Sequence, residues 1–472
     1  MTYYSTLAKL ATANNFVPPD AYNRYGVKRG LRNEDGTGVP VGITTISNVM
    51  GHEKIDGIAH PVPGKLFYRG LDVETLAQDF AGDHRFSFEK SLFLLLFGDQ
   101  PDEAQLSEFI PQLGEMRNLP GNFVRDVLQT FRTPNIMNAL GRAVLTLYSI
   151  DNKPDDLSLD NQVRQAMELN ARLVSLVPYA YHVIQAHFNN GSLIIHKPDP
   201  SLSTAENFLS LLRPSGEYTE TEARILDLAL FLHADHGGGN NSTFVTRSVS
   251  STMTDFYSAI GAAIGSLKGP LHGGANAKVM EQMEDLRRNV VNPQSRDQIR
   301  EYLFKVLSKE AFDGSGKIYG VGHAVYTLSD PRAIILRENA RQLAVEKGRE
   351  EELETFRIVE EEAPKVFQEF RNSPNANISA NVDFYSGFVY DMLDIPREVF
   401  TPIFAIGRMA GWAAHRLEVM SNPVKIMRPA YRTICKFCRT SGEGCVMERD
   451  ECRRDGREDF HRAIVNSISK KE

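Results

Sequence analysis

Long hydrophobic runs are absent from this 472-residue sequence, and cysteine and tryptophan are scarce. The longest apolar run near the start covers residues 92–97, which is too short to span a bilayer, and no basic segment followed by an apolar one marks a secretory leader. We therefore expect a cytoplasmic protein that does not bind membranes. Four cysteines in a chain of this length do not describe a secreted disulfide scaffold.

Clustered positive charge is also missing. The formal net charge is −7, and the Lys and Arg residues are spread along the chain without a dense run, so no surface field favours nucleic acid. Hydrophobic residues make up 42% of the chain and charged residues 24%, which is ordinary for a folded protein with a substantial core. A globular enzyme is the expected class.

Helical periodicity dominates what is present. Residues up to about 63 are rich in Gly, Pro, Asn and Thr and predict extended segments and turns. Further on, apolar residues at helical spacing predict a buried helix that stops at Gly98, carried by Phe88, Leu92, Leu95 and Leu96. Another helix is predicted to end at Gly237, with one face formed by Ala229, Leu232, His233 and His236. Further helical segments follow, so the predicted fold is mainly α.

Four short motifs place titratable side chains beside glycines, where a ligand can approach the backbone. In chain order they are HADHGGGNNSTF, GPLHGGANAKV, KIYGVGHAVYTLSDPR and NVDFYSG. Their glycine spacing matches neither the dinucleotide-binding fingerprint nor the P-loop, so the motifs do not predict a nucleotide phosphate site.

Three of these motifs carry groups suited to acid–base chemistry. His272 precedes a helix predicted from about Ala275, and because a helix N-terminus disfavours an imidazolium, a neutral His272 could donate to a developing oxyanion. His323 follows small residues that leave backbone N–H groups open to a carbonyl oxygen. Asp383 stands at the end of a predicted loop, before apolar helices that resume from Val389 to Met420, and its neighbours Val382 and Phe384 are apolar, a setting that raises a carboxyl pKa towards that of a general base. Local helix-start or Asx-turn roles are the alternatives.

The four motifs, in this order and at these separations, resemble the signature blocks of the citrate synthase family. The similarity extends from about Gly42 through Tyr431 and includes LFYRG at residues 66–70. The resemblance implies an acyltransferase that condenses acetyl-CoA with oxaloacetate and hydrolyses the thioester. It implies no cofactor, because the CoA thioester is a substrate.

The resemblance also assigns roles. His323 would polarise the oxaloacetate carbonyl, Asp383 would remove the methyl proton of acetyl-CoA, and His272 would stabilise the enolate. The implied oxaloacetate ligands are His236, Arg332, Arg408 and, from the partner subunit of a homodimer, Arg428. Arg408 and Arg428 stand in apolar sequence for which we expect helices. The guanidinium of Arg332 suits bidentate binding of a dicarboxylate.

The architecture implied is the two-domain helical fold of the family. A large domain would hold residues 1–275 and 384–434, a smaller helical domain would be inserted at 276–383, and residues 435–472 would form a charged tail. The catalytic groups would lie near the boundary of the two domains. Some family members hold the CoA phosphates with a lysine and an arginine that are missing from NANISANVD and HAVYT, so the contacts to CoA stay unassigned.

Two other functions compete with this interpretation. A 2-methylcitrate synthase uses propionyl-CoA with the same residues, and one methylene is worth only about 1–3 kcal/mol of discrimination. A metal-binding or regulatory protein with an inactive synthase site is the alternative from another class, and the intact histidines, arginines and aspartate argue against it.

Two patterns could indicate a metal. His233 and His236 form H-x-x-H, but no third ligand follows at zincin spacing and the glycines after it suit a substrate loop better, so we predict no metal there. The tail holds C-x2-C-x6-C-x6-C, formed by Cys435, Cys438, Cys445 and Cys452. A zinc site, a mobile tail with incidental cysteines and a shifted reading frame all stay open for this segment.

Overall fold

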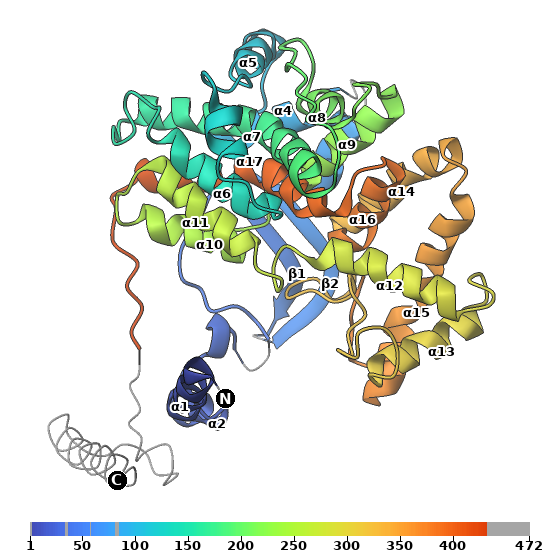
Figure 1. Cartoon of the computed structure of the whole chain (residues 1–472). Helices are drawn as coiled ribbons and strands as arrows, with labels where there is room; N and C mark the ends of the chain where they lie inside the picture. Colours follow the sequence, from blue (N-terminus) through green and yellow to red (C-terminus); the bar gives the residue numbers. More distant parts are fainter. Residues whose placement is uncertain (1, 34–35, 57, 81–84, 432–472) are drawn as a thin grey trace, which may run out of the picture. The chain divides into compact units, whose positions relative to one another are not determined.

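The structure, a computed structural model, describes residues 2–33, 36–56, 58–80 and 85–431, and most of them are helical (Figure 1). The predicted mainly α fold is therefore confirmed. Gly42–Met427 form one compact unit, and the described residues before and after it belong to a second unit. The division into a large domain and a smaller domain at 276–383 stays a prediction, and the tail at 435–472 lies outside the described residues.

The residues before Gly42 contain two helices, α1 (Tyr3–Asn15) and α2 (Asp20–Arg24), and a 3₁₀ turn, η1 (Arg29–Leu31). The prediction of extended chain is wrong here. The Thr2 hydroxyl caps α1 by accepting a hydrogen bond from the Ser5 N–H at 3.3 Å. Nearly all of α1 is exposed, so it has no buried apolar stripe that sequence periodicity could reveal. Its N-cap and the helix propensity of its Ala, Leu and Lys residues stabilise it instead.

An antiparallel sheet follows, built from β1 (Ser47–Ile55), β2 (Ile58–Tyr68) and β3 (Leu71–Asp72). Ser47 pairs with Tyr68, and the register shifts next to Gly51. A Cβ atom at Gly51 would collide with the carbonyl oxygen of Val325, and one at Gly64 would collide with that of Ser329. Glycine at both places lets the hairpin lie against the loop that follows His323.

Helices make up most of the chain after the sheet. The first group comprises α3 (Val73–Phe80), α4 (Ser87–Phe97), α5 (Glu103–Glu115), a π-helix η2 (Val124–Gln129), α6 (Ile136–Leu147), α7 (Leu159–Phe188), α8 (Thr204–Leu212), α9 (Glu220–His233), α10 (Asn241–Ser250) and α11 (Phe256–Leu267). The predicted buried helix is confirmed as α4, whose four named apolar residues are buried and whose C-cap is Gly98 at φ 100°.

A second group carries the rest of the compact unit. It comprises α12 (Ala275–Asn289), α13 (Arg296–Leu307), α14 (Pro331–Glu346), α15 (Glu350–Arg371), α16 (Val382–Met392), a 3₁₀ turn η3 (Arg397–Val399) and α17 (Phe400–Met420). Helix α17 packs against α4, α7, α9 and α10, and α16 packs against α12 and α14 (Figure 1). Among the described helices, none combines the length and the apolar character needed to cross a membrane.

Candidate active site

His236 lies three residues beyond α9, although apolar spacing predicted that the helix would reach it. The helix ends at His233 because other elements bind the backbone that follows. The Gly411 N–H donates to the carbonyl oxygen of the next residue at 2.9 Å, and the Asp235 N–H donates to the Tyr68 hydroxyl at 3.3 Å. The chain therefore leaves the helix, and His236 is buried outside it.

Three aromatic rings meet around His236. Its imidazole and that of His323 are perpendicular, with centroids 5.0 Å apart, and the His323 ring stacks on the buried Tyr326 ring at 4.8 Å. The Nε2 atom of His236 is buried and has no hydrogen-bond partner among the described residues. Burial, with the charges of Arg332 and other neighbours, holds the pKa of His236 well below its usual value, so this ring is neutral.

The tautomer of His323 follows from its backbone contacts. The N–H groups of Val325 and Tyr326 donate to His323 Nδ1 at 3.0 and 3.1 Å. A ring nitrogen that accepts hydrogen bonds carries no proton, so a neutral His323 has its proton on Nε2. The turn after the histidine thus fixes which nitrogen can act as a donor.

Residues 320–322 pair with the segment just before α16. The Gly322 N–H donates to Ser379 O at 2.8 Å, and the Asn381 N–H donates to Gly320 O at 2.8 Å. The Asn381 side-chain amide donates to Gly322 O at 2.9 Å. The expectation of open backbone N–H groups is wrong for Gly322, because the chain itself uses that donor. The pairing joins the loop of His323 to the start of α16.

Arg332 lies in the first turn of α14 and is one half of a buried ion pair. Its Nε and Nη2 donate to the two carboxylate oxygens of Asp330 at 3.0 and 2.7 Å. The same carboxylate accepts the Val382 N–H at 3.2 Å. Although burial opposes it, the Asp330 charge raises the pKa of Arg332 above its usual value. Arg332 therefore stays cationic, and its Nη1 makes no hydrogen bond to any described residue.

Arg408, in the middle of α17, is fully buried without an ion pair among the described residues. Its Nε donates to His233 O at 2.8 Å, and its guanidinium lies 4.6 Å from the centroid of the Phe404 ring. Both Nη atoms are buried without a hydrogen-bond partner in the described chain. Burial lowers the pKa of Arg408 to about 10, which still leaves it cationic at neutral pH. Such a guanidinium is suited to an anionic ligand.

His272 is bound from the start of α10. The Ser242 N–H donates to His272 Nε2 at 3.4 Å, and the Ser242 hydroxyl lies 3.0 Å from the same nitrogen. That hydroxyl accepts the indole N–H of Trp412 at 3.1 Å. Because Nε2 accepts, a neutral His272 carries its proton on Nδ1. Burial and the charge of Arg408 lower the pKa of His272 to about 4, so the ring is neutral.

The sequence had predicted that Asp383 stands at the end of a loop. The structure instead places it in the first turn of α16. Helix α16 begins at Val382, where the Asn381 side chain caps it by accepting the Asp383 N–H at 3.0 Å. Burial raises the pKa of Asp383 to about 6, against the opposing charge of Arg332. A half-buried carboxylate of this kind is suited to general base catalysis near neutral pH.

Six of the seven residues expected from the sequence therefore share one site. The charge of Arg408 acts on His236, His272 and Asp383, and that of Arg332 acts on His236 and Asp383. Arg428 belongs to the second unit and is exposed in the single chain. The expectation of a helix around Arg428 is wrong, because α17 ends at Met420.

The sequence interpretation missed several buried side chains around the site. They are Ser242, Tyr326, Asp330 and Trp412, described above, and His415, which binds Asp235 at 3.3 Å. One signal was available for two of them. Trp412 is the single tryptophan of the chain and, like His415, stands on the helical face of Arg408 at the spacing i, i+4, i+7.

Of the two sequence patterns that could indicate a metal, the structure describes only H-x-x-H. His233 Nε2 lies 2.8 Å from the Tyr390 hydroxyl, and His236 is outside α9, so the two histidines do not form a pair on one helical face. Within the described ranges, no three side chains of His, Cys, Asp or Glu gather as a metal site would require. The four tail cysteines lie outside the described residues, so the zinc question stays with the sequence.

Known proteins are similar to this chain over most of its length. Residues 32–430 match the family model described as citrate synthase, C-terminal domain. Citrate synthase from Synechocystis sp. is 37% identical over 396 residues, which cover 83% of this chain and 88% of that protein. The 2-methylcitrate synthase of Shewanella oneidensis is 33% identical, over 77% of this chain and 87% of that protein.

A solved structure agrees with these sequence similarities. Citrate synthase from Thermoplasma acidophilum, in a ternary complex with carboxymethyl coenzyme A and oxaloacetate, matches with a TM-score of 0.68 and 25% identity. The match covers 88% of this chain and 97% of that one. Sequence, site geometry and fold thus lead to one assignment: the chain belongs to the citrate synthase family.

Proposed function

We propose that this protein is an acyltransferase that condenses acetyl-CoA with oxaloacetate and water to give citrate and CoA. One observation carries the proposal. Nη1 and Nη2 of Arg408 and Nε2 of His236 are buried polar atoms without a partner among the described residues. Buried donors cost about 1–3 kcal/mol each when they stay unpaired, so a ligand with several acceptor oxygens is expected there.

Oxaloacetate fits this demand as a small dicarboxylate. Arg408 would hold one carboxylate with its two Nη donors, in the bidentate geometry that guanidinium groups favour. Arg332, held by Asp330 through Nε and Nη2, would offer Nη1. His236 would add a donor from its neutral ring. The positive charge of Arg408, which has no ion pair in the described chain, would then be balanced by the substrate.

His323 would polarise the ketone of oxaloacetate. Its Nδ1 is bound by backbone N–H groups, so the proton of the neutral ring lies on Nε2. An N–H donor at the ketone oxygen stabilises the negative charge that develops when the carbonyl carbon is attacked. Stacking on Tyr326 supports a fixed ring orientation.

Asp383 and His272 would generate the nucleophile together. Asp383 removes a methyl proton of acetyl-CoA, and the Nδ1–H of neutral His272 donates to the thioester oxygen as it becomes an enolate oxygen. Neither step suffices alone, because a carboxylate is a weak base for a C–H bond unless the enolate is stabilised as it forms.

Condensation and hydrolysis complete the reaction. The methyl carbon forms a bond to the ketone carbon of oxaloacetate, whose oxygen takes up a proton to become a hydroxyl. Water then attacks the thioester carbonyl of the resulting citryl-CoA, the C–S bond breaks, and citrate and CoA leave. Every atom comes from the two substrates and water, so we propose that no further cofactor takes part.

We also propose that the protein works in the cytoplasm as a homodimer whose sites are completed by Arg428 of the partner subunit. Arg428 is exposed in the single chain, as an arginine that serves another subunit would be. Helix α6 leaves Leu145 48% exposed beside Gly261 of α11, where a Cβ atom would lie 3.0 Å from the leucine side chain, and Gly265 further along α11 is open. An apolar side chain beside a glycine gives a second chain room for close packing.

The direct test follows CoA release with a thiol reagent. We expect release from acetyl-CoA only when oxaloacetate is present, with citrate as the product identified by NMR. Asp383→Asn serves as the matched control, because it keeps the size of the side chain and removes the base. Oxaloacetate-independent release, or none, would contradict the proposal. Similarity to a 2-methylcitrate synthase keeps propionyl-CoA as the second candidate substrate.

A further inference from the structure

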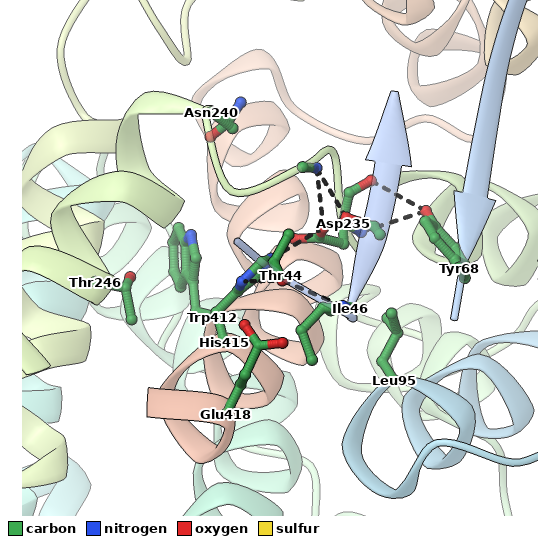
Figure 2. Close-up of polar contacts among 12 residues, drawn as sticks. Thr44, Ile46, Tyr68, Leu95, Asp235, Asn240, Thr246, Trp412, His415 and Glu418 are labelled. Carbon is green, nitrogen blue, oxygen red and sulfur yellow. Dashed lines mark hydrogen bonds and ion pairs between the residues drawn. The ribbon is translucent and has the colours of Figure 1, made fainter. Parts of the chain in front are cut away.

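One face of α17 extends from the site to a second polar cluster, which is formed by Ser47, Asp235 and His415. Arg408 lies in the site, and His415 follows two turns later on the same face. Between them, Gly411 lets the helix approach Asp235, because a Cβ atom there would collide with Asp235 Oδ1. Figure 2 shows Asp235 lying between Tyr68 and the end of this face at His415.

Three donors bind the same oxygen of the buried Asp235 carboxylate. Oδ2 accepts hydrogen bonds from the Ser47 hydroxyl, from the Gly237 N–H at 3.0 Å, and from His415 Nε2 at 3.3 Å. The other oxygen, Oδ1, is buried and has no hydrogen-bond partner in the described chain. Only one of the two carboxylate oxygens, Oδ2, is thus hydrogen-bonded within the described chain.

The contacts of His415 fix its Nε2 as a hydrogen-bond donor in this cluster. Arg247 Nη1 donates to His415 Nδ1 at 2.9 Å and also binds Glu418 at 2.5 Å. Because arginine cannot accept hydrogen bonds, Nδ1 must be the acceptor, and the ring proton lies on Nε2, opposite Asp235. The contact to Asp235 is therefore an N–H···O hydrogen bond.

Asp235 and Arg408 are buried opposite charges that form no ion pair with each other in the described residues. They are near enough to interact. Burial lowers the pKa of Arg408, and the negative charge of Asp235 acts in the opposite direction. Yet Asp235 Oδ1 and both Nη atoms of Arg408 lack partners. Pairing would satisfy all three atoms, and it would also occupy the nitrogens that the proposed function leaves to a substrate carboxylate.

We propose that His415 is a positioning residue that, with Ser47, keeps the Asp235 carboxylate turned away from Arg408. Both Nη atoms of Arg408 then stay open for the substrate carboxylate, while Asp235 still balances part of its charge. This inference rests on the proposed function, because it assigns those two nitrogens to oxaloacetate. His415 itself does not touch the substrate.

The test compares two replacements of His415 by isothermal titration with oxaloacetate. His415→Leu removes one of the three hydrogen bonds to Asp235 Oδ2 and so favours pairing of Asp235 with Arg408, and we expect oxaloacetate to bind about tenfold more weakly or worse, as when one charge-assisted contact is lost. His415→Gln keeps an N–H donor near the position of Nε2 and should bind within about threefold of the wild type. Turnover at saturating oxaloacetate and the KM for acetyl-CoA should change little in both.

A double variant separates this mechanism from a general loosening of the fold. Asp235→Asn cannot form an ion pair, so Asp235→Asn/His415→Leu should recover part of the affinity that His415→Leu loses, by about threefold or more. His182→Leu is the matched control. It removes another buried histidine, whose Nε2 lies 3.0 Å from Leu211 O, and should leave oxaloacetate affinity unchanged.

Two outcomes would overturn the inference: wild-type affinity in a folded His415→Leu protein, or a double variant that binds no better than His415→Leu. If His415→Leu fails to fold, Ser47→Ala removes a smaller group from the same oxygen and should weaken binding several-fold, and unchanged affinity there would refute the proposal. Direct titration keeps this test separate from the proposed function, since oxaloacetate binding is measured even if the wild type releases no CoA.

Discussion

The imidazole rings of His236 and His323 meet edge to face, with centroids 5.0 Å apart and planes at 89°. His236 is neutral because it is buried beside Arg332 and Arg408, and the Nδ1 of His323 is bound by backbone donors. The site therefore joins neutral ring donors to two permanent cations. This combination suits a dianionic substrate that has a polar group between its carboxylates.

The two arginines should differ in what their loss does to stability. Arg408→Leu removes a buried charge that has no ion pair in the described chain, so we expect oxaloacetate affinity to fall about 30-fold or more with a small change in Tm. Arg332→Leu leaves the buried Asp330 carboxylate unpaired, which should weaken binding and also cost about 3–5 kcal/mol of stability. Titration calorimetry and thermal unfolding check both. Equal Tm losses, or unchanged affinity in both variants, would contradict the assignment.

The acid–base pair should act on turnover and not on oxaloacetate binding. In the proposed mechanism Asp383 and His272 act on the acyl-CoA methyl and the enolate, so we expect Asp383→Asn and His272→Ala each to lower kcat by about two to four orders of magnitude. Oxaloacetate affinity should stay near that of the wild type in both variants, as measured by titration. Near-normal turnover in either variant would refute its role.

The pH dependence of kcat/KM for acetyl-CoA should reflect the ionisation of Asp383. A base acts in its deprotonated form, and burial raises the pKa of Asp383 to about 6. The kcat/KM for acetyl-CoA should therefore be constant above that pH and fall about tenfold per unit as the pH drops below it. His272 stays neutral down to about pH 4, so it adds no limb near 6. A profile that stays flat down to pH 4.5 would argue against Asp383 as the base.

Mixed dimers test whether Arg428 serves the partner subunit. Asp383→Asn and Arg428→Leu homodimers should both be nearly inactive. After co-refolding, half of the dimers should be heterodimers in which one site carries both lesions and the other carries none. Activity should recover to about a quarter of the wild-type value if pairing is random and the sites are independent. No recovery, with heterodimers verified by mass, would place Arg428 within its own subunit.

The sequence predicted most of the site because its chemistry lies in short local motifs. Helix α12 starts at Ala275 as expected, and His272 precedes it, since glycines and apolar spacing mark helix ends locally. The end of α9 was misplaced because distant groups, Gly411 and Tyr68, take over the backbone after His233. Contacts of that kind leave no trace in local periodicity.

The supporting side chains were harder to foresee. Ser242 binds His272 across 30 positions of sequence, and Asp235 reaches His415 across 180. Buried polar partners follow from tertiary packing, so residue type and spacing alone do not identify them. The exposed helix α1 was missed for the opposite reason, because it buries no apolar stripe.

The ratio of kcat/KM for acetyl-CoA to that for propionyl-CoA, with saturating oxaloacetate, tests the central claim most directly. We expect acetyl-CoA to be preferred by about 10-fold to 200-fold, the range that one methylene provides in an apolar pocket. Both thioesters use the same base and the same oxyanion donor, so the ratio reports the space beside the methyl group alone. Equal values would contradict the assignment. A preference for propionyl-CoA would also contradict it and would make the protein a 2-methylcitrate synthase.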